Sequence, residues 1–411
     1  MNKIEYHEKL LKIRGLITQP REWPKDLQKI KIIEGKTECY VETDESIYEA
    51  TSFFNPVMAI NRDLTLIAVI AYAKKYNKKM RIIDPLGGIG VRALRLANEA
   101  NEWISQIIIN DFSDVSTSIA SYNIHESGLD DTIKLFQREA KSLILDLAEN
   151  NFKFHYIDLD PFGPPTPFID TIWSAFAISG LASITATDMT ALCGIYPESC
   201  LRKYGSIPLN NFHTHETAAR ILLATIARSA SRQEFGIHPL LTVSVDHYCK
   251  IFVKVRKSRG LANEAASQIG FSYTCRECFQ IYYKSYQESP PTCCGELDKA
   301  GPLWIGPLFD KEWCQLFEVT LNEIELPSTK RIAKLLREGI ETGDLKGYYA
   351  LDEIGRKLHS SQPKTQALID ALASQGYRTI TTEFRKQSIR TDATTKILMD
   401  VFSTLVTKNS D

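Results

Sequence analysis

The run Asp160-Pro161-Phe162-Gly163 joins an acid, a proline, an aromatic and a glycine, and three more prolines follow within four residues. An exocyclic amine on an aromatic base is a poor nucleophile because its lone pair is delocalised into the ring, so it needs acceptors for its hydrogens. Asp160 and the carbonyl of Pro161 can accept those N–H groups, while proline stiffens the backbone and Phe162 can stack on the base. The simpler alternative is a proline-terminated strand with a buried aromatic.

A second group of candidates combines acids and glycines that follow short apolar runs. Asp84 precedes glycines that include Gly88, and such a turn lets a ligand approach the backbone. Asp111 ends the next run, where an acid can bind ribose hydroxyls, and Glu139 ends the third, where an adenine edge can be read. Each feature alone also suits a tight turn, a helix N-cap or a surface carboxylate. No P-loop lysine follows, which disfavours phosphoryl transfer and favours S-adenosylmethionine, a ligand without phosphate.

These residues require elements that bring them to one edge, and the sequence predicts such elements. Strand-like and helix-like runs alternate, with the strands ending at Asp84, Asp111, Glu139, Asp160 and Asp188. This alternation predicts an α/β, doubly wound parallel sheet that binds ligands beyond the carboxyl ends of its strands. Residues 64–76 have the composition of a buried helix, and residues 168–180 read as a helix before the strand 181–188.

The runs 240–248 and 249–257 leave no room for a crossover helix, so we expect an antiparallel ribbon at the edge of the sheet. By analogy this is the class I, Rossmann-like methyltransferase arrangement, although fold alone does not establish function. We predict an N-terminal extension (1–34), a catalytic domain (35–258) and a smaller C-terminal α+β domain (259–411) that binds RNA and contains the cysteine-bearing segment 271–298.

Four of the nine cysteines have nearly the spacing of a zinc ribbon. Cys275 and Cys278 form a C-x-x-C pair, whereas Cys293 and Cys294 are adjacent, which compresses the second half of the motif. We therefore expect either a zinc site or free thiols. Without a secretory signal, a disulfide framework is not expected.

Composition indicates an ordinary globular protein, with 44% hydrophobic and 24% charged residues and a formal net charge of -1. No apolar window approaches the roughly 20 residues of a membrane span, so we expect no membrane association, a cytoplasmic location and a monomer. Basic residues gather in the first 31 residues and in residues 383–391, and they could grip RNA or simply form a solvated surface. Asp188 and the run Asp246–Tyr248 could line a base pocket, although core hydrogen bonding is the expected role of His247.

The chain resembles the Trm1 family of tRNA (guanine-26 N2) methyltransferases. The resemblance rests on EGK, FFNPVMAINRD, IDLDPFGPPTPFIDTIW, TATDMTALCGIYPESCLRKYG, HETAARILLATIAR, DHYCKIFVKV, GPLWIGPL and IGRKLH, and it covers about residues 33–395. It implies that Arg62 and Arg92 touch the cofactor, with Asp111 at its ribose, and that Asp160 accepts the guanine amine. Together the candidate cofactor-binding residues are Arg62, Asp84, Gly88, Arg92, Asp111, Phe112, Glu139 and Ala140.

The function predicted from these features is methylation of the exocyclic N2 amine of guanine 26 in tRNA, giving N2-methyl- and N2,N2-dimethylguanosine. Asp160, Pro161 and Phe162 are the candidate catalytic residues, and the target guanine must be flipped out of its stack. Two alternatives remain. The same turn chemistry serves amino methylation of DNA bases, and a methyltransferase scaffold without activity could serve as an RNA-binding protein.

Overall fold

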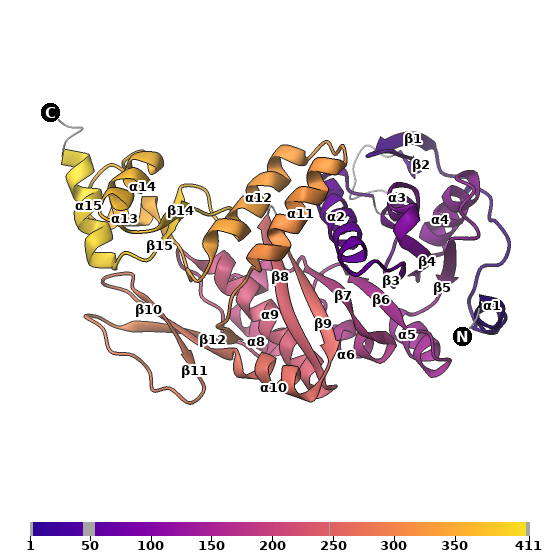
Figure 1. Ribbon diagram of the computed structural model, residues 1–411, viewed down its shortest axis with the longest axis horizontal. Helices are drawn as coiled ribbons and strands as arrows, with labels where there is room; N and C mark the ends of the chain where they lie inside the picture. Colours follow the sequence, from indigo (N-terminus) through magenta and orange to yellow (C-terminus); the bar gives the residue numbers. More distant parts are fainter. Residues whose placement is uncertain (1–2, 44–53, 246, 408–411) are drawn as a thin grey trace. The chain divides into compact units, whose positions relative to one another are not determined.

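The computed structural model describes residues 3–43, 54–245 and 247–407 (Figure 1). Two compact units make up the chain, and each is drawn from three stretches of sequence. The first unit comprises Met1–Thr185, Phe252–Lys257 and Leu316–Ala333, and the second comprises Ala186–Ile251, Ser258–Gln315 and Lys334–Asp411. The units therefore do not coincide with contiguous segments, and the predicted domain boundaries at residues 34 and 258 stay predictions.

Seven strands form the central sheet, in the order β5-β4-β3-β6-β7-β9-β8 (Figure 1). Their bounds are β3 Met80–Asp84, β4 Ile104–Asp111, β5 Ile133–Gln137, β6 Phe154–Leu159, β7 Phe176–Ala186, β8 Phe235–Val245 and β9 Tyr248–Lys257. β3 pairs in parallel with both β4 and β6, β4 with β5, and β6 with β7. Strand addition therefore reverses between β3 and β6, the switch point at which such sheets bind ligands. The predicted doubly wound α/β sheet is confirmed, and β8 and β9 are neighbours at its edge as expected.

Helices connect the parallel strands, in the pattern that right-handed crossovers require. α3 (Val91–Glu99) and α4 (Asp114–Glu126) follow β3 and β4, while α5 (Ala140–Glu149) and α6 (Thr166–Ile172) follow β5 and β6. In Figure 1, α3 lies above the strands and α5 and α6 lie below them. Short 3₁₀ turns cover Pro56–Met58, Asn101–Trp103 and Trp173–Ala175.

The predicted helix 168–180 is wrong beyond residue 175, because β7 begins at Phe176. Gly180 therefore lies within a strand rather than at a helix end. A Cβ atom on Gly180 would lie 2.3 Å from the carbonyl oxygen of His155, so a residue without a side chain permits this close approach to the neighbouring strand β6. Phe176 and Ile178 favour a strand, and pairing with β6 overrides the helical periodicity of this run.

α2 (Ala59–Tyr76) contains the buried helix predicted for residues 64–76. With the preceding 3₁₀ turn it spans 21 residues, long and apolar enough to cross a membrane by length and composition, which corrects the expectation that no such stretch exists. However, 72% of its apolar window is buried within the fold. This helix therefore has the character of a core helix, buried on nearly every face.

The N-terminal segment packs on the edge strand β5 instead of standing apart from the sheet. After α1 (Lys3–Leu11), Leu16 bridges Phe136 in antiparallel fashion. The guanidinium of Arg21 then donates to Asp114 and Thr117, each at 3.1 Å, and to Gln137 at 2.7 Å. The segment ends in a hairpin of β1 (Lys29–Glu34) and β2 (Thr37–Glu42). Arg21 is thus engaged in holding the segment in place, which limits its value as an RNA contact.

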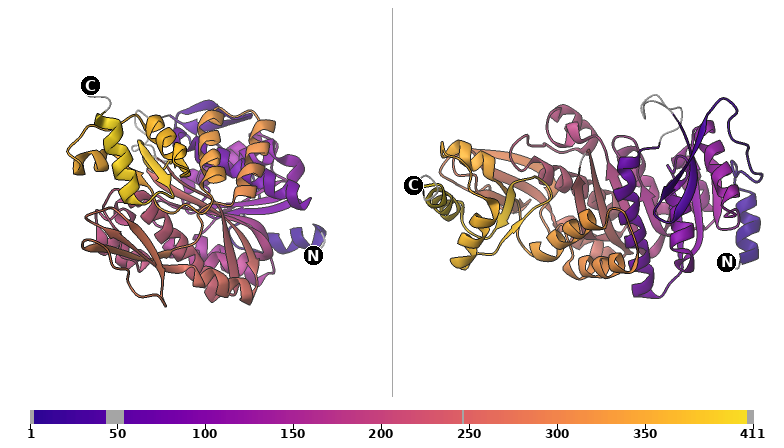
Figure 2. Two further views of the ribbon diagram at one scale, coloured as in Figure 1. Left: turned by 60° about the vertical axis from the view of Figure 1, so that its left-hand side comes forward. Right: turned by 90° about the horizontal axis from the view of Figure 1, so that it is seen from above.

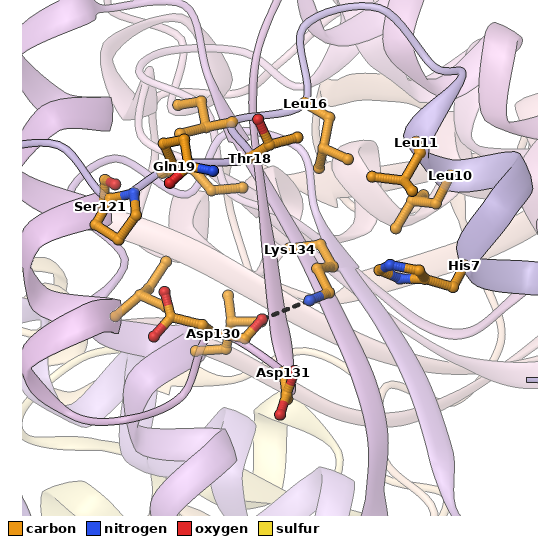
Figure 3. Close-up of a pocket in the computed structure, with 15 residues that line it drawn as sticks. His7, Leu10, Leu11, Leu16, Thr18, Gln19, Ser121, Asp130, Asp131 and Lys134 are labelled. Carbon is orange, nitrogen blue, oxygen red and sulfur yellow. Dashed lines mark hydrogen bonds between the residues drawn. The ribbon is translucent and has the colours of Figure 1, made fainter. Parts of the chain in front are cut away.

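A pocket of about 230 Å³ lies between α1 and the start of β5 (Figure 3). His7, Leu10 and Leu11 of α1 line one side, and Lys134 with Asp130 lines another. Ligands of doubly wound sheets bind at the carboxyl ends of strands. Because this pocket lies at the amino end of β5, it is distinct from the edge that carries the candidate acids.

The second unit contains helices and two small antiparallel sheets beside its part of the central sheet. One small sheet has the order β11-β10-β12 and the other the order β13-β15-β14. The strands near the C-terminus are drawn in yellow in Figure 2. The strands are β10 Ile269–Cys275, β11 Ile281–Ser285, β12 Leu297–Trp304, β13 Tyr349–Ala350, β14 Thr379–Thr381 and β15 Ser388–Thr391. The helices from α7 onward are α7 Met189–Leu192, α8 Pro197–Tyr204, α9 Thr214–Arg232, α10 Arg259–Ser267, α11 Lys311–Glu323, α12 Thr329–Thr342, α13 Leu351–Lys357, α14 Thr365–Ser374 and α15 Thr395–Thr407. Of these, α11 and α12 contribute residues to both units. The α+β character predicted for the C-terminal region is confirmed.

Buried ion pairs hold the last part of the chain onto α9. Arg390 on β15 is fully buried and pairs with Glu216 of α9 at 2.5 Å and with Glu338 of α12 at 3.0 Å. Glu216 also accepts from Arg220 at 2.8 Å and from the backbone N–H of Gly347 at 2.9 Å. Removing one partner of such a network leaves an uncompensated buried charge, so it fixes the register of these elements.

Candidate active site

The acid of the Asp160-Pro161-Phe162-Gly163 turn follows directly after β6. Only 12% of the Asp160 side chain is exposed, whereas 73% of Phe162 is exposed. The alternative of a proline-terminated strand with a buried aromatic is therefore wrong. Gly163 has φ +84°, and a Cβ there would meet no atom within 4 Å, so glycine is required by conformation and not by crowding. The turn presents an aromatic face next to a nearly buried carboxylate.

Arg92, in the first turn of α3, connects three carboxylates, those of Asp84 at the end of β3, Asp158 within β6 and Asp160 directly after β6. Its Nε lies 3.3 Å from Asp84, its Nη1 lies 3.3 Å from Asp158, and its Nη2 donates to Asp160. The side chains of these aspartates are 6%, 1% and 12% exposed, and that of Arg92 is 10% exposed. One buried guanidinium thus neutralises one of three nearby carboxylates and leaves a local excess of negative charge.

Asp158, which was not predicted from the sequence, is the most deeply buried of the three carboxylates that pair with Arg92. The side chain accepts hydrogen bonds from Tyr156 at 2.7 Å and from Thr65 at 3.1 Å, and the Tyr156 hydroxyl also lies 2.6 Å from Ser183. The run Asp158-Leu-Asp160 was a usable signal, because residues two apart in a strand point to the same face. An acid inside a buried strand needs partners, and here it finds a hydroxyl pair and Arg92.

Burial and charge raise the pKa of Asp84 to about 7. Loss of solvation is the largest cause, and the neighbouring carboxylates Asp158 and Asp160 add to it while Arg92 opposes it. For Arg92 itself, burial lowers the pKa, but the three carboxylates outweigh it and raise the pKa above its usual value. The guanidinium therefore stays charged, whereas Asp84 can exchange a proton near neutral pH.

The glycine turn after β3 is tied to the end of β4. The backbone N–H of Gly88 donates to the carboxylate of Asp111 at 3.1 Å, and Asp111 also accepts from the N–H of Ser113 at 2.9 Å. Burial raises the pKa of Asp111 despite these bonds. The side chain of Asn110, another residue not foreseen, bonds the backbone of both Pro85 and Arg138. The loops after β3, β4 and β5 therefore form one connected edge.

Glu139 caps helix α5. Its carboxylate accepts from the backbone N–H groups of Lys141 at 3.1 Å and Ser142 at 2.8 Å. This is the helix N-cap role that the sequence left open as an alternative to ligand binding. Burial raises the pKa of Glu139, but the two backbone bonds outweigh it and lower the pKa. Ala140 is buried, and 77% of Phe112 is exposed.

Arg62 lies in a buried ionic network with the end of β1. It donates from Nε to Glu34 at 2.6 Å and pairs through Nη2 with the other oxygen of the same carboxylate. Arg95 also donates to Glu34, at 3.0 Å, and to Asp63, at 2.5 Å. Burial raises the pKa of Glu34, but the two arginines outweigh burial and lower it. The predicted N-terminal extension thus supplies a carboxylate that holds Arg62.

The other predicted pocket residues have different positions. Asp188 accepts from the hydroxyl of Tyr204 at 2.5 Å and from the ammonium of Lys203 at 3.2 Å. His247 is exposed, so the expected role in core hydrogen bonding is wrong. Asp246 lies outside the residues that the structure describes.

The four predicted metal ligands come together at one point of the second unit. The sulfur atoms of Cys275 and Cys294 are 3.8 Å apart, those of Cys278 and Cys293 are 3.4 Å apart, and all four lie within 4.8 Å of one another. In a tetrahedral site with Zn–S bonds of about 2.3 Å, neighbouring sulfurs are about 3.8 Å apart. The adjacent pair of cysteines is therefore compatible with a four-sulfur site.

Comparisons with known proteins agree over nearly the whole chain. Residues 33–403 match the family described as N2,N2-dimethylguanosine tRNA methyltransferase. A Methanobrevibacter smithii protein named tRNA (guanine(26)-N(2))-dimethyltransferase is 31% identical over 392 residues, which cover 93% of this chain and 100% of that protein. A Pyrococcus abyssi protein of the same name is 30% identical over 390 residues, covering 92% and 99%. The solved structure of Trm1 from Pyrococcus horikoshii with S-adenosyl-L-methionine has a TM-score of 0.79 and 28% identity, and covers 90% of this chain and 99% of that chain.

Proposed function

Because the chain belongs to the N2,N2-dimethylguanosine tRNA methyltransferase family, we propose that it transfers methyl groups from S-adenosylmethionine to the exocyclic N2 amine of guanine 26 in tRNA. The products are N2-methyl- and N2,N2-dimethylguanosine. The observation that carries this proposal is the position of Asp160, a nearly buried carboxylate at the carboxyl end of β6, beside the topological switch point.

Asp160 and Pro161 supply the acceptors that the amine requires. The bound cofactor provides an electrophilic methyl group on its sulfonium. The carboxylate of Asp160 and the carbonyl of Pro161 accept the N–H groups of the amine, which orients the nitrogen lone pair toward the methyl group. During transfer the S–C bond of the sulfonium would break as the N–C bond forms, its electron pair staying on sulfur. The amine nitrogen would become cationic, and Asp160 would take the proton that the nitrogen releases. Arg92 holds Asp160 in place throughout.

Phe162 and Gly163 suit the base itself. The exposed ring of Phe162 offers a surface on which a guanine can stack, and the open space at Gly163 lets the base come close to the backbone. A base stacked within tRNA cannot reach a carboxylate that is 12% exposed, so we propose that guanine 26 is flipped out of its stack.

The cofactor is proposed to bind along the connected loops after β3, β4 and β5. The residues present fit it, because Asp111 stands at the end of β4, where an acid binds ribose hydroxyls, and the turn at Gly88 lets a ligand approach. Ala140 and the backbone at Glu139 are proposed to border the adenine, while the Glu139 carboxylate caps α5. Arg62, bound to Glu34, is proposed to shape the cofactor pocket through Phe54, whose ring centroid lies 5.2 Å from its guanidinium.

The decisive experiment incubates the protein with methyl-labelled S-adenosylmethionine and transcribed tRNA. We expect label in N2-methyl- and N2,N2-dimethylguanosine, and none when guanine 26 is replaced by adenine. Asp160→Ala should abolish transfer while tRNA binding in a gel-shift assay persists. Label that survives replacement of guanine 26 would refute the site of modification, and an active Asp160→Ala protein would refute the catalytic assignment.

A zinc ion is proposed for the four-cysteine cluster, which it would hold together as a structural site. Metal analysis of protein never exposed to chelators should find about one zinc per chain. Cys278→Ser should lose the metal and melt at a lower temperature, whereas Cys193→Ser, outside the cluster, should keep it. Metal-free native protein would refute the proposal.

The tRNA is proposed to be bound by a cytoplasmic monomer. Two of the basic residues in the N-terminal segment have exposed partners: Lys31 pairs with Glu38, and Lys29 donates to Tyr122 at 2.7 Å. These pairs are solvent-exposed and weak, so phosphates can compete for the same lysines. Size-exclusion chromatography with light scattering, with and without tRNA, tests the stoichiometry, and a dimer would contradict the proposal.

A further inference from the structure

Asn61, a residue in the first turn of α2, contributes a buried hydrogen-bond donor to the Arg92 cluster. The side chain is 0% exposed, and its Oδ1 accepts a hydrogen bond from Arg92 Nη1 at 2.8 Å. Arginine can only donate, so this bond fixes which end of the amide is oxygen and which is nitrogen. The Nδ2 group of Asn61 has no hydrogen-bond partner among residues 3–43, 54–245 and 247–407.

A buried amide N–H without an acceptor costs free energy, so most such groups in proteins are paired or meet a ligand. Among the residues that the structure describes, none accepts from this N–H group, although Arg92 brings three carboxylates into the same cluster. Arg92 pairs with Asp84, Asp158 and Asp160 through its own N–H groups, and the Thr65 hydroxyl donates a hydrogen bond to Asp158. Asn61 therefore contributes a buried donor that none of the described residues accepts from, at a place where the acids nearby are held by Arg92.

The charge of the cluster indicates what the ligand group is. Three carboxylates around one guanidinium leave an excess of negative charge, which favours the cationic part of an amino acid, its ammonium group. In an α-amino acid the carboxylate is bonded to the same carbon as the ammonium. It must therefore come close to the same aspartates, where it needs a donor to offset their repulsion.

We infer that the side-chain amide of Asn61 binds the carboxylate of the methionyl part of the cofactor, with Arg92 setting its orientation. This inference rests on the proposed function, since it takes S-adenosylmethionine as the ligand. Asn61 then has two tasks, one for each end of its amide. The oxygen supports Arg92, and the nitrogen recognises a group that distinguishes the cofactor from a simple nucleoside.

The test compares two ligands that differ only in that carboxylate, S-adenosylmethionine and its decarboxylated form, by isothermal titration calorimetry without tRNA. The wild-type protein should bind S-adenosylmethionine about 10-fold or more tightly than the decarboxylated form. Asn61→Ala should weaken binding of S-adenosylmethionine by about 10-fold more than binding of the decarboxylated form. Asn61→Asp, which keeps the oxygen that faces Arg92, should reverse the preference.

Thr65→Val is the matched control, because it removes another acceptor of Arg92 Nη1 while leaving the Asn61 amide intact. This variant should lower the affinity for both ligands by the same factor. If Asn61→Ala and Asn61→Asp also lower the affinity for both ligands by the same factor, Asn61 only supports Arg92 and the inference is overturned. If wild-type protein binds neither ligand, the proposed function itself fails, so the two failures can be told apart.

Discussion

Replacing Asp84 by asparagine should make the protein more stable at alkaline pH while weakening its cofactor binding. The carboxylate of Asp84 is buried and faces Arg92 on α3 as well as Asp158 and Asp160 on and after β6. Burial is the largest cause that raises its pKa, from 3.8 to about 7, and Arg92 compensates only in part because it is shared among three acids. Asparagine removes the negative charge and keeps the side-chain oxygen that accepts from the N–H of Leu86 at 3.3 Å.

The sign of the pH dependence follows from which state holds the proton. Between about pH 4 and pH 7 the folded protein keeps a proton on Asp84 that the unfolded chain has lost. The free energy of unfolding therefore falls as the pH rises through this window, and the loss is complete above pH 7. A displacement from 3.8 to about 7, at about 1.4 kcal/mol per pH unit, corresponds to roughly 4 kcal/mol.

The assay is the difference in melting temperature between Asp84→Asn and the wild type, measured from pH 4.5 to 8.5. Taking the difference cancels the titration of groups common to both proteins. At about 2–4 °C per kcal/mol, the variant should gain roughly 7–14 °C on the wild type between the ends of this range. Asp131→Asn, at an exposed position, is the control for replacing an aspartate by asparagine in this assay. A difference for Asp84→Asn that does not change with pH would refute the reasoning.

Three further outcomes are expected. Glu34→Ala leaves Arg62 and Arg95 without their shared carboxylate and should cost about 3–5 kcal/mol by thermal or urea unfolding, whereas Glu38→Ala, which breaks the exposed pair with Lys31, should change little. Phe162→Ala should lower kcat/KM for tRNA by roughly 5- to 150-fold through lost stacking, with an unchanged melting temperature because the ring is 73% exposed; a normal rate would exclude stacking on the base. Glu139→Ala should lower stability by about 1 kcal/mol as α5 loses its cap, and unaltered unfolding would show that the cap contributes nothing.

The strand-end acids could be predicted from the sequence because strand order and direction follow from alternating periodicity. Asp84, Asp111 and Asp160 are all placed as expected at the ends of parallel strands or directly after them. What periodicity cannot give is how buried polar groups choose partners. Nothing in the local sequence says that Arg92 is shared by three acids, or that Glu34, 28 residues away in the chain, would pair with Arg62. Such pairings depend on tertiary contacts between segments far apart in sequence.

The roles of Glu139 and Phe162 also depend on tertiary surroundings that the local sequence does not specify. An acid before a helix can cap it or bind a ligand, and the backbone bonds from Lys141 and Ser142 settle only the first role. An aromatic after a strand can be core or surface, and only its exposure in the folded structure excludes the core. Sequence thus locates the chemistry-bearing residues, whereas their task depends on surroundings that the fold creates.

The acid cluster also shows why this edge of the sheet should be read as a binding site and not as a stabilising ion network. In the Glu216–Arg390–Glu338 network of the second unit, Arg220 adds a second cation, so two acids face two arginines. Around Arg92, three acids face one arginine, and an amide donor of Asn61 has no partner among the described residues. A network selected for stability would be balanced in charge, because uncompensated buried charge is costly. The imbalance therefore fits a site completed by a ligand that brings both a cation and an acceptor, which an amino-acid group does.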